Sequence, residues 1–159
     1  VVSAQGDTTD DLIAKAKDSE GEISAWVEPT FVKTTSPYAC VSQNLNRISL
    51  DADNVGDISF FGYGAGRYPT AFTVINDCVD VANGVKKTYN ENMKKVQINN
   101  SLASHCYYIS SSACDKIEIP TREKWASGIL TEPVSIREMH DFYKELLNKD
   151  PQAFIAGVY

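Results

Sequence analysis

The stretch FFGYGAGRYPTAF, residues 60–72, contains the residue types best suited to contact with a ligand. It places Gly62, Gly64 and Gly66 between an apolar run and Pro69. Glycine adopts positive φ values readily and has no Cβ to hold a ligand away from the backbone. A helix that starts after such a loop offers free N–H groups and a partial positive charge. Two interpretations follow: a tight turn with a purely structural purpose, or a loop that contacts an anion or a cofactor.

The loop is not a dinucleotide fingerprint of the G-x-G-x-x-G type. Such a fingerprint would need glycine at position 67, which is Arg67. It would also need an acidic residue about 20 positions further on, at the end of a second strand. The acidic residue at that distance, Asp80, falls inside the helix expected after the loop. The sequence therefore excludes a Rossmann turn here.

The cysteines and histidines do not form a metal-binding pattern. No pair of cysteines has C-x-x-C spacing, and the only histidines are His105 and His140. We expect no metal site, and we expect His105 to be an ordinary strand residue. Reduced thiols, buried as small hydrophobic side chains, are expected at Cys40, Cys78, Cys106 and Cys114.

Composition limits the class of protein. The chain has 159 residues, 43% of them hydrophobic and 23% charged, which is typical of one globular domain or of a domain with a small appendage. A net charge of −6 disfavours nucleic acid as a partner. The apolar runs are too short to span a bilayer, and the start resembles no signal peptide, so we expect a cytoplasmic protein. Because the first residue is Val1 rather than Met, we expect a piece of a longer protein.

The first half of the chain predicts short strands followed by one apolar helix. Residues 8–17 fit either a capped helix or the first strand of a hairpin with residues 23–32. A short helix is expected at 37–46, and two strands are expected on either side of a tight turn at Gly56. Pro69 and Gly84 are suitable start and end signals for the next helix. Apolar residues cover most of its circumference, so we expect it to be buried on several sides.

The second half contains the clearest helix. Residues 86–100 are polar and without apolar periodicity, which indicates a boundary between subdomains. A strand is expected at 105–110. Ser135 and Glu138 form a capping box before an apolar stripe, and Pro151 stops that helix before a closing strand at 153–159.

Residues 12–85 resemble the carboxy-terminal part of the catalytic domain of homoserine dehydrogenases. The most specific piece is G-x-G-A-G-x-x-P-T-A, which runs from Gly62 to Ala71 and is followed by the helix with Asp77. The resemblance implies paired strands near the start, so it favours the hairpin over the helix. It also implies that the glycine loop lies against the nicotinamide coenzyme, NAD or NADP, from the substrate-domain side. The implied cofactor-binding residues are Gly62, Gly64, Ala65 and Gly66.

Other parts of the family's active site have no counterpart in these residues. The resemblance implies a parent that interconverts L-homoserine and L-aspartate 4-semialdehyde, on the route to threonine and methionine. The family's coenzyme domain, its catalytic lysine and its substrate-binding aspartate and glutamate precede the matched region, and no D-x-x-G-x-D-x-x-x-K pattern occurs here. No catalytic residue is therefore assigned, and we expect the chain alone to be inactive. The family's dimerisation through this domain implies a homodimer.

The tail, residues 101–159, resembles the family less closely. Many homoserine dehydrogenases end in an ACT-type regulatory module, and the strand, helix and closing strand of the tail fit such a module. The usual D-x-P-G-V-L ligand turn is not visible, so a degenerate ACT-like module and another α/β cap both remain open. Threonine is the effector that the resemblance suggests. The expected division is 1–95 for the catalytic part and 101–159 for the tail.

The expected fold class is α+β, with a mixed or antiparallel sheet that has helices packed on one face, followed by a small α/β ACT-like subdomain. Two classes of function fit the sequence. The first is part of an oxidoreductase; the second is a non-catalytic amino-acid-binding regulatory or dimerisation module. A coenzyme domain and a catalytic lysine encoded upstream would distinguish the first from the second.

Overall fold

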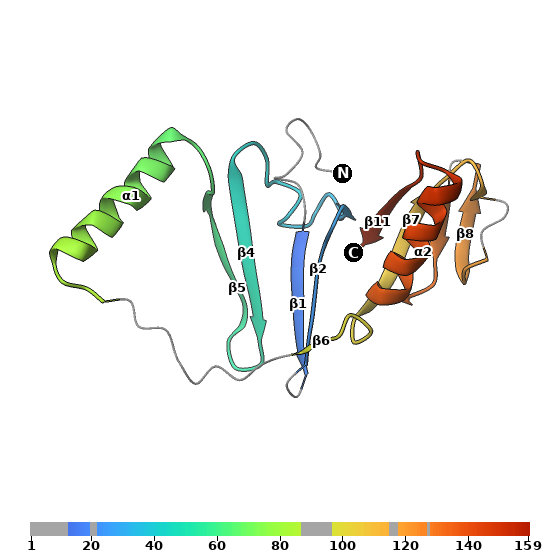
Figure 1. The fold of residues 1–159 in the computed structure, drawn as a ribbon, viewed down its shortest axis with the longest axis horizontal. Coiled ribbons are helices and arrows are strands. Elements are labelled where there is room, and N and C mark those ends of the chain that lie inside the picture. The colour runs from blue at the N-terminus through green and yellow to red at the C-terminus, as the bar shows by residue number, and fades with distance from the viewer. Residues whose placement is uncertain (1–12, 20–21, 87–96, 115–117, 127) are drawn as a thin grey trace. The chain divides into compact units, whose positions relative to one another are not determined.

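The computed structural model describes residues 13–19, 22–86, 97–114, 118–126 and 128–159 (Figure 1). The capping pattern expected at residues 8–11 lies outside these residues. The same is true of residues 87–96, which make up most of the polar segment at 86–100. The helices are α1 (Arg67–Ala82) and α2 (Ile136–Lys149). The strands are β1 (Ile13–Ser19), β2 (Glu22–Glu28), β3 (Thr30–Phe31), β4 (Leu45–Ala52), β5 (Gly56–Tyr63), β6 (Gln97–Ile98), β7 (Ser104–Ser110), β8 (Thr121–Trp125), β9 (Gly128–Thr131), β10 (Val134–Ser135) and β11 (Phe154–Val158).

The chain forms two compact units, residues 1–33 with 94–159 and residues 34–93. This division differs from the one expected between residues 95 and 101. The reason lies in strand pairing, because β3 pairs in parallel with β11 and β6 pairs in parallel with β2. The two ends of the chain therefore belong to one unit, and the segment between them forms the other.

The first unit begins with the hairpin that the resemblance favoured. β1 and β2 pair antiparallel from Ile13 opposite Glu28 to Ser19 opposite Glu22, which confirms the hairpin. β6 joins β2 to complete a three-stranded mixed sheet. A larger mixed sheet follows in the order β3-β11-β7-β9-β8, with β10 paired to β7. These mixed and antiparallel sheets with few helices confirm an α+β fold.

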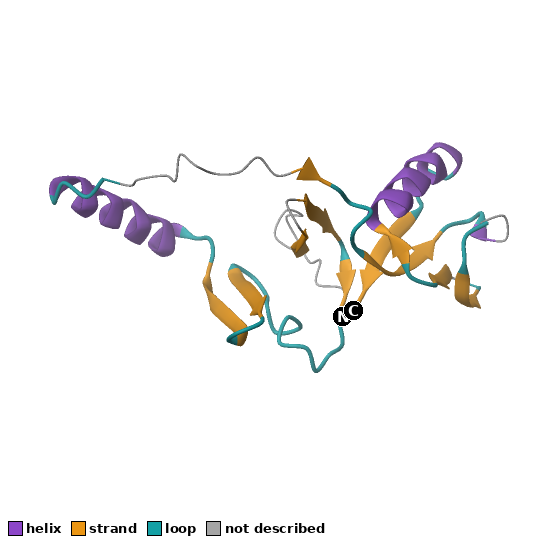
Figure 2. Ribbon diagram, turned by 90° about the horizontal axis from the view of Figure 1, so that it is seen from below, coloured by secondary structure: helices purple, strands orange, loops and turns teal. Residues whose placement is uncertain are grey.

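The core of the first unit lies between the larger sheet and α2, which crosses one face of that sheet (Figures 1 and 2). Side chains of β7 alternate between buried and half-buried positions, as expected of a strand with one covered face. Tyr107 and Ile109 point into the core from β7, and Ile136 and Met139 meet them from α2. The buried cluster comprises Ala103, Tyr107, Ile109, Ile129, Val134, Ile136, Met139, Leu146, Ala153 and Ile155.

The predicted start signal of α2 is confirmed. The Ser135 hydroxyl accepts a hydrogen bond from the backbone N–H of Glu138, and the Glu138 carboxylate accepts one from the N–H of Ser135. This reciprocal pair satisfies N–H groups that the first turn leaves without helical partners. The helix ends at Lys149, directly before Asp150 and Pro151, as the sequence predicts.

The second unit consists of the β4–β5 hairpin and α1. The two strands pair antiparallel around a turn in which Gly56 has a φ of 68°, so the predicted glycine turn is confirmed. Gly84 follows the last turn of α1 with a φ of 69°, the left-handed conformation that commonly ends a helix. Pro69 occupies the third position of α1 rather than the first.

The helix expected at residues 37–46 is wrong. The segment instead forms successive tight turns, in which the N–H groups of Ala39 and Val41 donate to the carbonyls three residues earlier. Gln43 has a φ of 56°, which a right-handed helix does not accommodate. The turns reverse the chain into β4.

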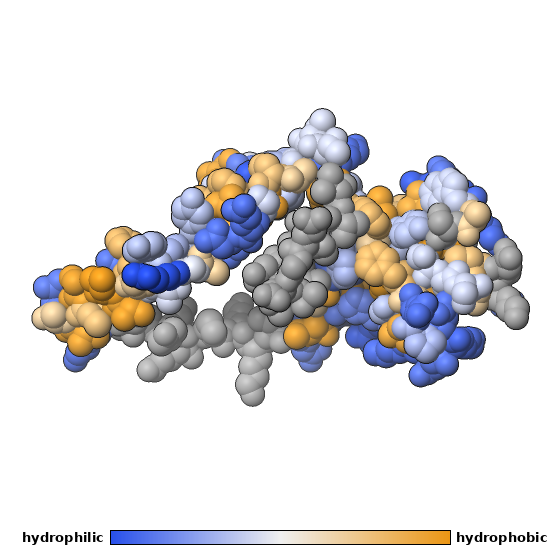
Figure 3. All heavy atoms as spheres, turned by 90° about the horizontal axis from the view of Figure 1, so that it is seen from above, coloured by the Kyte–Doolittle hydropathy of each residue, from blue (hydrophilic) through white to orange (hydrophobic). Residues whose placement is uncertain are grey.

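The expected burial of α1 is also wrong within this chain, since none of its residues is buried. Apolar side chains of α1 are exposed, among them Phe72, Ile75 and Val79. Figure 3 shows hydrophobic residues on the surface of this helix. Among the described residues, no element packs extensively against the helix. Within the described ranges, no helix is both long and apolar enough to cross a membrane.

The cysteines are free, but their burial differs from expectation. Cys106 and Cys114 are half-buried, whereas Cys40 and Cys78 are exposed in the second unit. The expectation of buried thiols is therefore wrong for Cys40 and Cys78, because the unit that carries them has little covered surface.

Candidate functional site

The glycine loop connects the end of β5 to the start of α1 in the second unit. Gly62 is the penultimate residue of β5, Gly64 and Ala65 form the loop, and Gly66 is the N-cap of α1. The Gly64 N–H donates to the Asn44 carbonyl at 2.8 Å, and the Asn44 side-chain amide donates to the Ala65 carbonyl at 2.8 Å. Asn44 therefore binds the loop through both its backbone carbonyl and its side-chain amide. The predicted site residues all lie within this one loop and the end of β5 that precedes it.

Two of the glycines have structural reasons within the loop itself. A Cβ on Gly64 would lie 1.8 Å from the Nδ2 atom of Asn46, so a side chain there would displace the exposed Asn46 side chain. Gly66 has a φ of 114°, which residues with a side chain rarely adopt. The structural interpretation of the loop thus accounts for Gly64 and Gly66.

Gly62 has no such structural reason. A Cβ at this position would meet no described atom within 4 Å, and the residue does not have a positive φ. The loop therefore leaves open space beside Gly62, where a ligand can approach the backbone. Ala65, the neighbour with the smallest side chain, adds little bulk at the same turn.

The start of α1 carries uncompensated positive potential. Its first turn contains no acidic residue, and Gly66 provides no side-chain cap. The N–H groups of Arg67 and Tyr68 point out of the first turn, where no helical carbonyl reaches them. The guanidinium of Arg67 lies 5.2 Å from the centre of the Tyr68 ring. These features suit a polar or anionic ligand group beside the loop.

A polar group on the β4–β5 hairpin was missed by sequence reasoning. Arg47 Nη2 donates to the Ser59 hydroxyl at 2.8 Å, and the hydroxyls of Ser49 and Ser59 lie 2.8 Å apart. The Arg47 guanidinium also lies 5.5 Å from the centre of the Tyr38 ring. The alternation of polar residues along both strands was the signal that could have indicated a shared polar face.

The first unit contains a buried charged cluster centred on Glu28, whose exposed fraction is 3%. The Nε2 atom of His105 lies 2.7 Å from Oε1 of Glu28, close enough for an ion pair but without the alignment of a hydrogen bond. The Trp26 indole donates to the same oxygen at 3.2 Å. The Tyr159 hydroxyl lies 2.9 Å from Nδ1 of His105. His105 is a buried residue of β7, which confirms the strand position that the sequence predicts.

Two tyrosines beside this cluster resist ionisation. Burial, followed by the negative charge of Glu28, raises the pKa of Tyr107 far above its usual range. The same two causes raise the pKa of Tyr159. The buried Tyr107 hydroxyl has no well-aligned hydrogen-bond partner among the described residues. Both phenols are therefore expected to stay protonated near neutral pH.

The described residues contain no group of three or more His, Cys, Asp or Glu side chains that could hold a metal ion. The geometry therefore gives one candidate ligand-contacting surface in the second unit, the backbone of residues 62–66 together with the start of α1. In the first unit it gives a buried cluster that stabilises the fold.

Comparison with known proteins identifies the kind of protein that carries this loop. Residues 3–79 match the family model described as homoserine dehydrogenase. The homoserine dehydrogenase of Lactococcus lactis is 33% identical over 94 residues, which are 56% of this chain and 22% of that protein. The NAD(+)-dependent homoserine dehydrogenase of Pseudomonas canavaninivorans is 34% identical over 68 residues, 43% of this chain and 19% of that protein.

A solved structure extends the likeness beyond the matched sequence. The homoserine dehydrogenase from Thiobacillus denitrificans superimposes with a TM-score of 0.61 at 17% identity, over 93% of this chain and 42% of that chain. This likeness concerns the fold alone. The chain spans less than half the length of these relatives, so it corresponds to a part of each.

Proposed function

We propose that this chain, whose residues 3–79 belong to the homoserine dehydrogenase family, supplies one wall of the active site of such an enzyme. The whole enzyme interconverts L-homoserine and L-aspartate 4-semialdehyde with NAD or NADP, on the route to threonine and methionine. The observation that carries the proposal is the glycine loop at residues 62–66, because it lies inside the family match and presents open backbone before a helix start.

The residues of the loop fit contact with a nicotinamide coenzyme. Gly62 and Ala65 add almost no bulk, and the start of α1 offers N–H groups without a competing acidic side chain. A bound coenzyme would supply or accept the hydride. The backbone of residues 62–66 would contact one side of it, and the hydrogen bonds from Asn44 would keep the loop in shape. The loop carries no acid or base, so its role is binding and orientation.

The chain alone is expected to lack activity. Hydride transfer needs a coenzyme and a carbonyl carbon held together, with a proton donor within reach. The coenzyme domain and the catalytic lysine of the family have no counterpart in this sequence. Both NAD and NADP remain candidates, because the residues that contact the coenzyme's ribose belong to that other domain.

The remaining features support further parts of the proposal. The exposed apolar surface of α1 suits contact with the rest of the enzyme or with a second copy, in line with a cytoplasmic homodimer. The strand, helix and closing strand of residues 104–158 suit an ACT-like regulatory module, for which threonine is the candidate effector. The first helix of an ACT module has no counterpart in the described residues between β7 and β8.

Two assays test the proposal. The purified chain should give no homoserine-dependent reduction of NAD or NADP, and turnover by the chain alone would contradict it. In the complete enzyme, Ala65→Trp should weaken coenzyme binding by about tenfold or more, because indole bulk then occupies the space beside the loop. Glu145→Trp, at an exposed position of α2, is the matched control. Equal coenzyme affinity in the two variants would contradict the assignment of the loop.

A further inference from the structure

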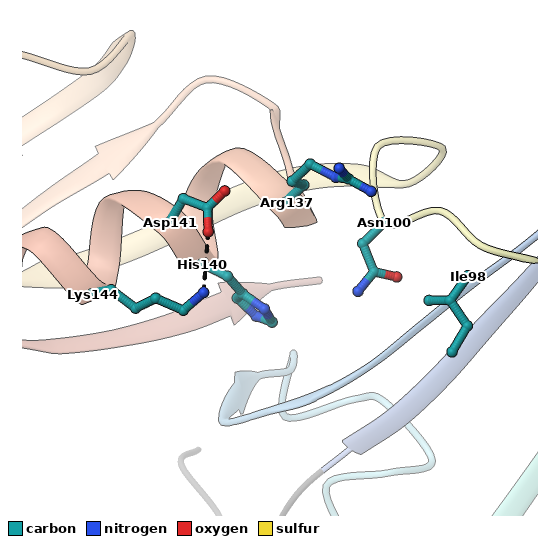
Figure 4. Close-up of a pocket in the computed structure, with 6 residues that line it drawn as sticks. All are labelled: Ile98, Asn100, Arg137, His140, Asp141 and Lys144. Carbon is teal, nitrogen blue, oxygen red and sulfur yellow. Dashed lines mark hydrogen bonds and ion pairs between the residues drawn. The ribbon is translucent and has the colours of Figure 1, made fainter.

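A hollow of about 200 Å³ lies beside α2 in the first unit (Figure 4). Four of its residues come from one face of the helix, at positions 137, 140, 141 and 144. The other two come from β6 and the turn that follows it. The lining residues are Ile98, Asn100, Arg137, His140, Asp141 and Lys144. Its volume corresponds to about six water molecules, enough for a small organic molecule.

Most of the side chains that line the hollow carry hydrogen-bond donors. Lys144 Nζ pairs with Asp141 Oδ1 at 3.1 Å, and both of these side chains are largely exposed. The Asn100 side-chain oxygen already accepts from the Ser24 hydroxyl at 3.2 Å and from the Ala25 N–H at 3.0 Å. The Asn100 NH₂ group is therefore the part of this amide that remains to donate to a ligand.

Arg137 is the unbalanced charge of the hollow. Its backbone N–H donates to the Asn100 carbonyl at 3.1 Å, which fixes the base of the side chain beside that turn. Its guanidinium has no ion pair or hydrogen bond among the described residues, and Figure 4 shows it extending toward Asn100. Arg137 is exposed, so its guanidinium is accessible to a ligand from solution.

His140 also lines the hollow. Its Nε2 atom lies 3.7 Å from Oε2 of the buried Glu28, which is longer than a hydrogen bond. Ile98, with an exposed fraction of 69%, provides an apolar surface on the opposite side. A ligand in the hollow would thus meet cationic and amide donors at one end and a hydrocarbon surface at the other.

We propose that this hollow binds a small aliphatic carboxylate. The carboxylate pairs with the planar fork of Arg137 and accepts from the Asn100 amide, and the hydrocarbon part lies on Ile98. Arginine suits this role because its parallel N–H groups match the two oxygens of a carboxylate. The site is separate from the glycine loop, so it stands or falls independently of the proposed enzymatic function.

A titration of the full chain with butyrate tests the class of ligand. Chemical shift changes in ¹H–¹⁵N spectra should gather at Asn100, Arg137 and His140, with a dissociation constant of about 10 mM or tighter. Butyramide, which has the same shape without the charge, should bind at least about tenfold more weakly. Scattered shift changes, or equal binding of the two compounds, would overturn the proposal. Inorganic phosphate binding as tightly as butyrate would overturn the assignment to a carboxylate.

Two arginine variants test the residue. Arg137→Gln should weaken butyrate binding by about tenfold or more, because it removes the charge and the fork. Arg122→Gln is the matched control, since Arg122 lies on β8 and pairs with Glu132 at 3.1 Å outside the hollow. The amide spectrum of α2 shows whether each variant keeps its fold. Equal losses in the two variants, or unchanged binding by Arg137→Gln, would overturn the proposal.

Discussion

The Nε2 atom of His105 lies 2.7 Å from Oε1 of Glu28, at the point where the first strand pair meets the carboxy-terminal strand. Both side chains are almost fully buried. Tyr159 and Trp26 add contacts to the imidazole and to the carboxylate, respectively. This cluster links β2 near the start of the chain to β7 and to the last residue.

Glu28→Gln should destabilise the first unit. The amide keeps the shape of the carboxylate but removes the negative charge that faces His105. We expect the free energy of unfolding to fall by about 1–3 kcal/mol, measured by urea denaturation. Glu132→Gln, which alters only the exposed pair with Arg122, should change it by less than about 0.5 kcal/mol. Equal effects of the two substitutions would show that the buried pair has no special role.

Gly157→Ala should disturb the same cluster sterically. A Cβ at this position would lie 2.6 Å from Oε1 of Glu28 and 2.8 Å from Nε2 of His105. Because both neighbours are buried and held by other contacts, we expect a loss of about 1–3 kcal/mol in the free energy of unfolding. Gly62→Ala is the control for stability, since an added Cβ there meets nothing within 4 Å. A Gly157→Ala variant as stable as the parent would mean that the side chains of Glu28 and His105 move aside at little energetic cost.

Asp150 should make the first unit sensitive to acid. Its Oδ2 atom accepts from the Ser111 hydroxyl at 2.8 Å, from the Ser112 N–H at 2.7 Å and from the Ser112 hydroxyl at 2.9 Å. The hydrogen bond from the Ser111 side chain, followed by those from Ser112, lowers the pKa of Asp150 from 3.8 to about 2. The stabilisation is therefore present above pH 3.8 and is lost as the pH falls toward 2.

Asp150→Asn checks this dependence. The variant should be less stable at neutral pH and should lose less stability than the parent between pH 4 and pH 2, as measured by thermal unfolding at a series of pH values. Asp141→Asn, at an exposed position, is the control. A parent and an Asp150→Asn variant with parallel pH profiles would contradict the prediction.

Tyr107 should make the first unit sensitive to alkali. Its pKa is raised in the folded state by burial and by Glu28, so the unfolded chain loses the phenolic proton first. Stabilisation from this group is present below pH 10 and declines as the pH rises further. Tyr107→Phe should flatten the decline above pH 10, whereas Tyr63→Phe, at an exposed position, should not. Circular dichroism along a pH series measures both, and identical alkaline transitions would refute the prediction.

The sequence predicted the elements whose signals are local. The capping box at Ser135 and Glu138, the apolar stripe that follows it and the glycine turn at Gly56 each specify a structure within a few residues. The helix prediction at 37–46 was wrong because Pro37 resembles a helix start. Nothing in the sequence indicates the left-handed conformation of Gln43. Successive turns and a short helix share the same residue preferences, so tertiary context decided between them.

The sequence did not predict the long-range contacts. The pairing of β3 with β11 joins residues more than 120 positions apart, and no local pattern specifies such a register. Glu28, His105 and Tyr159 meet only because of that pairing, so the buried cluster was not expected. The apolar circumference of α1 led to an expectation of burial, but among the described residues nothing covers the helix. The position of the glycine loop between a strand and a helix was predictable because its residues are consecutive, although α1 begins two residues before Pro69.

A crystal structure of the complete enzyme with NAD or NADP would show whether residues 62–66 contact the coenzyme. We expect the nicotinamide half of the coenzyme within about 4 Å of the backbone at residues 62–66, in contact with Gly62 and Ala65. A coenzyme bound in full occupancy far from this loop would contradict it.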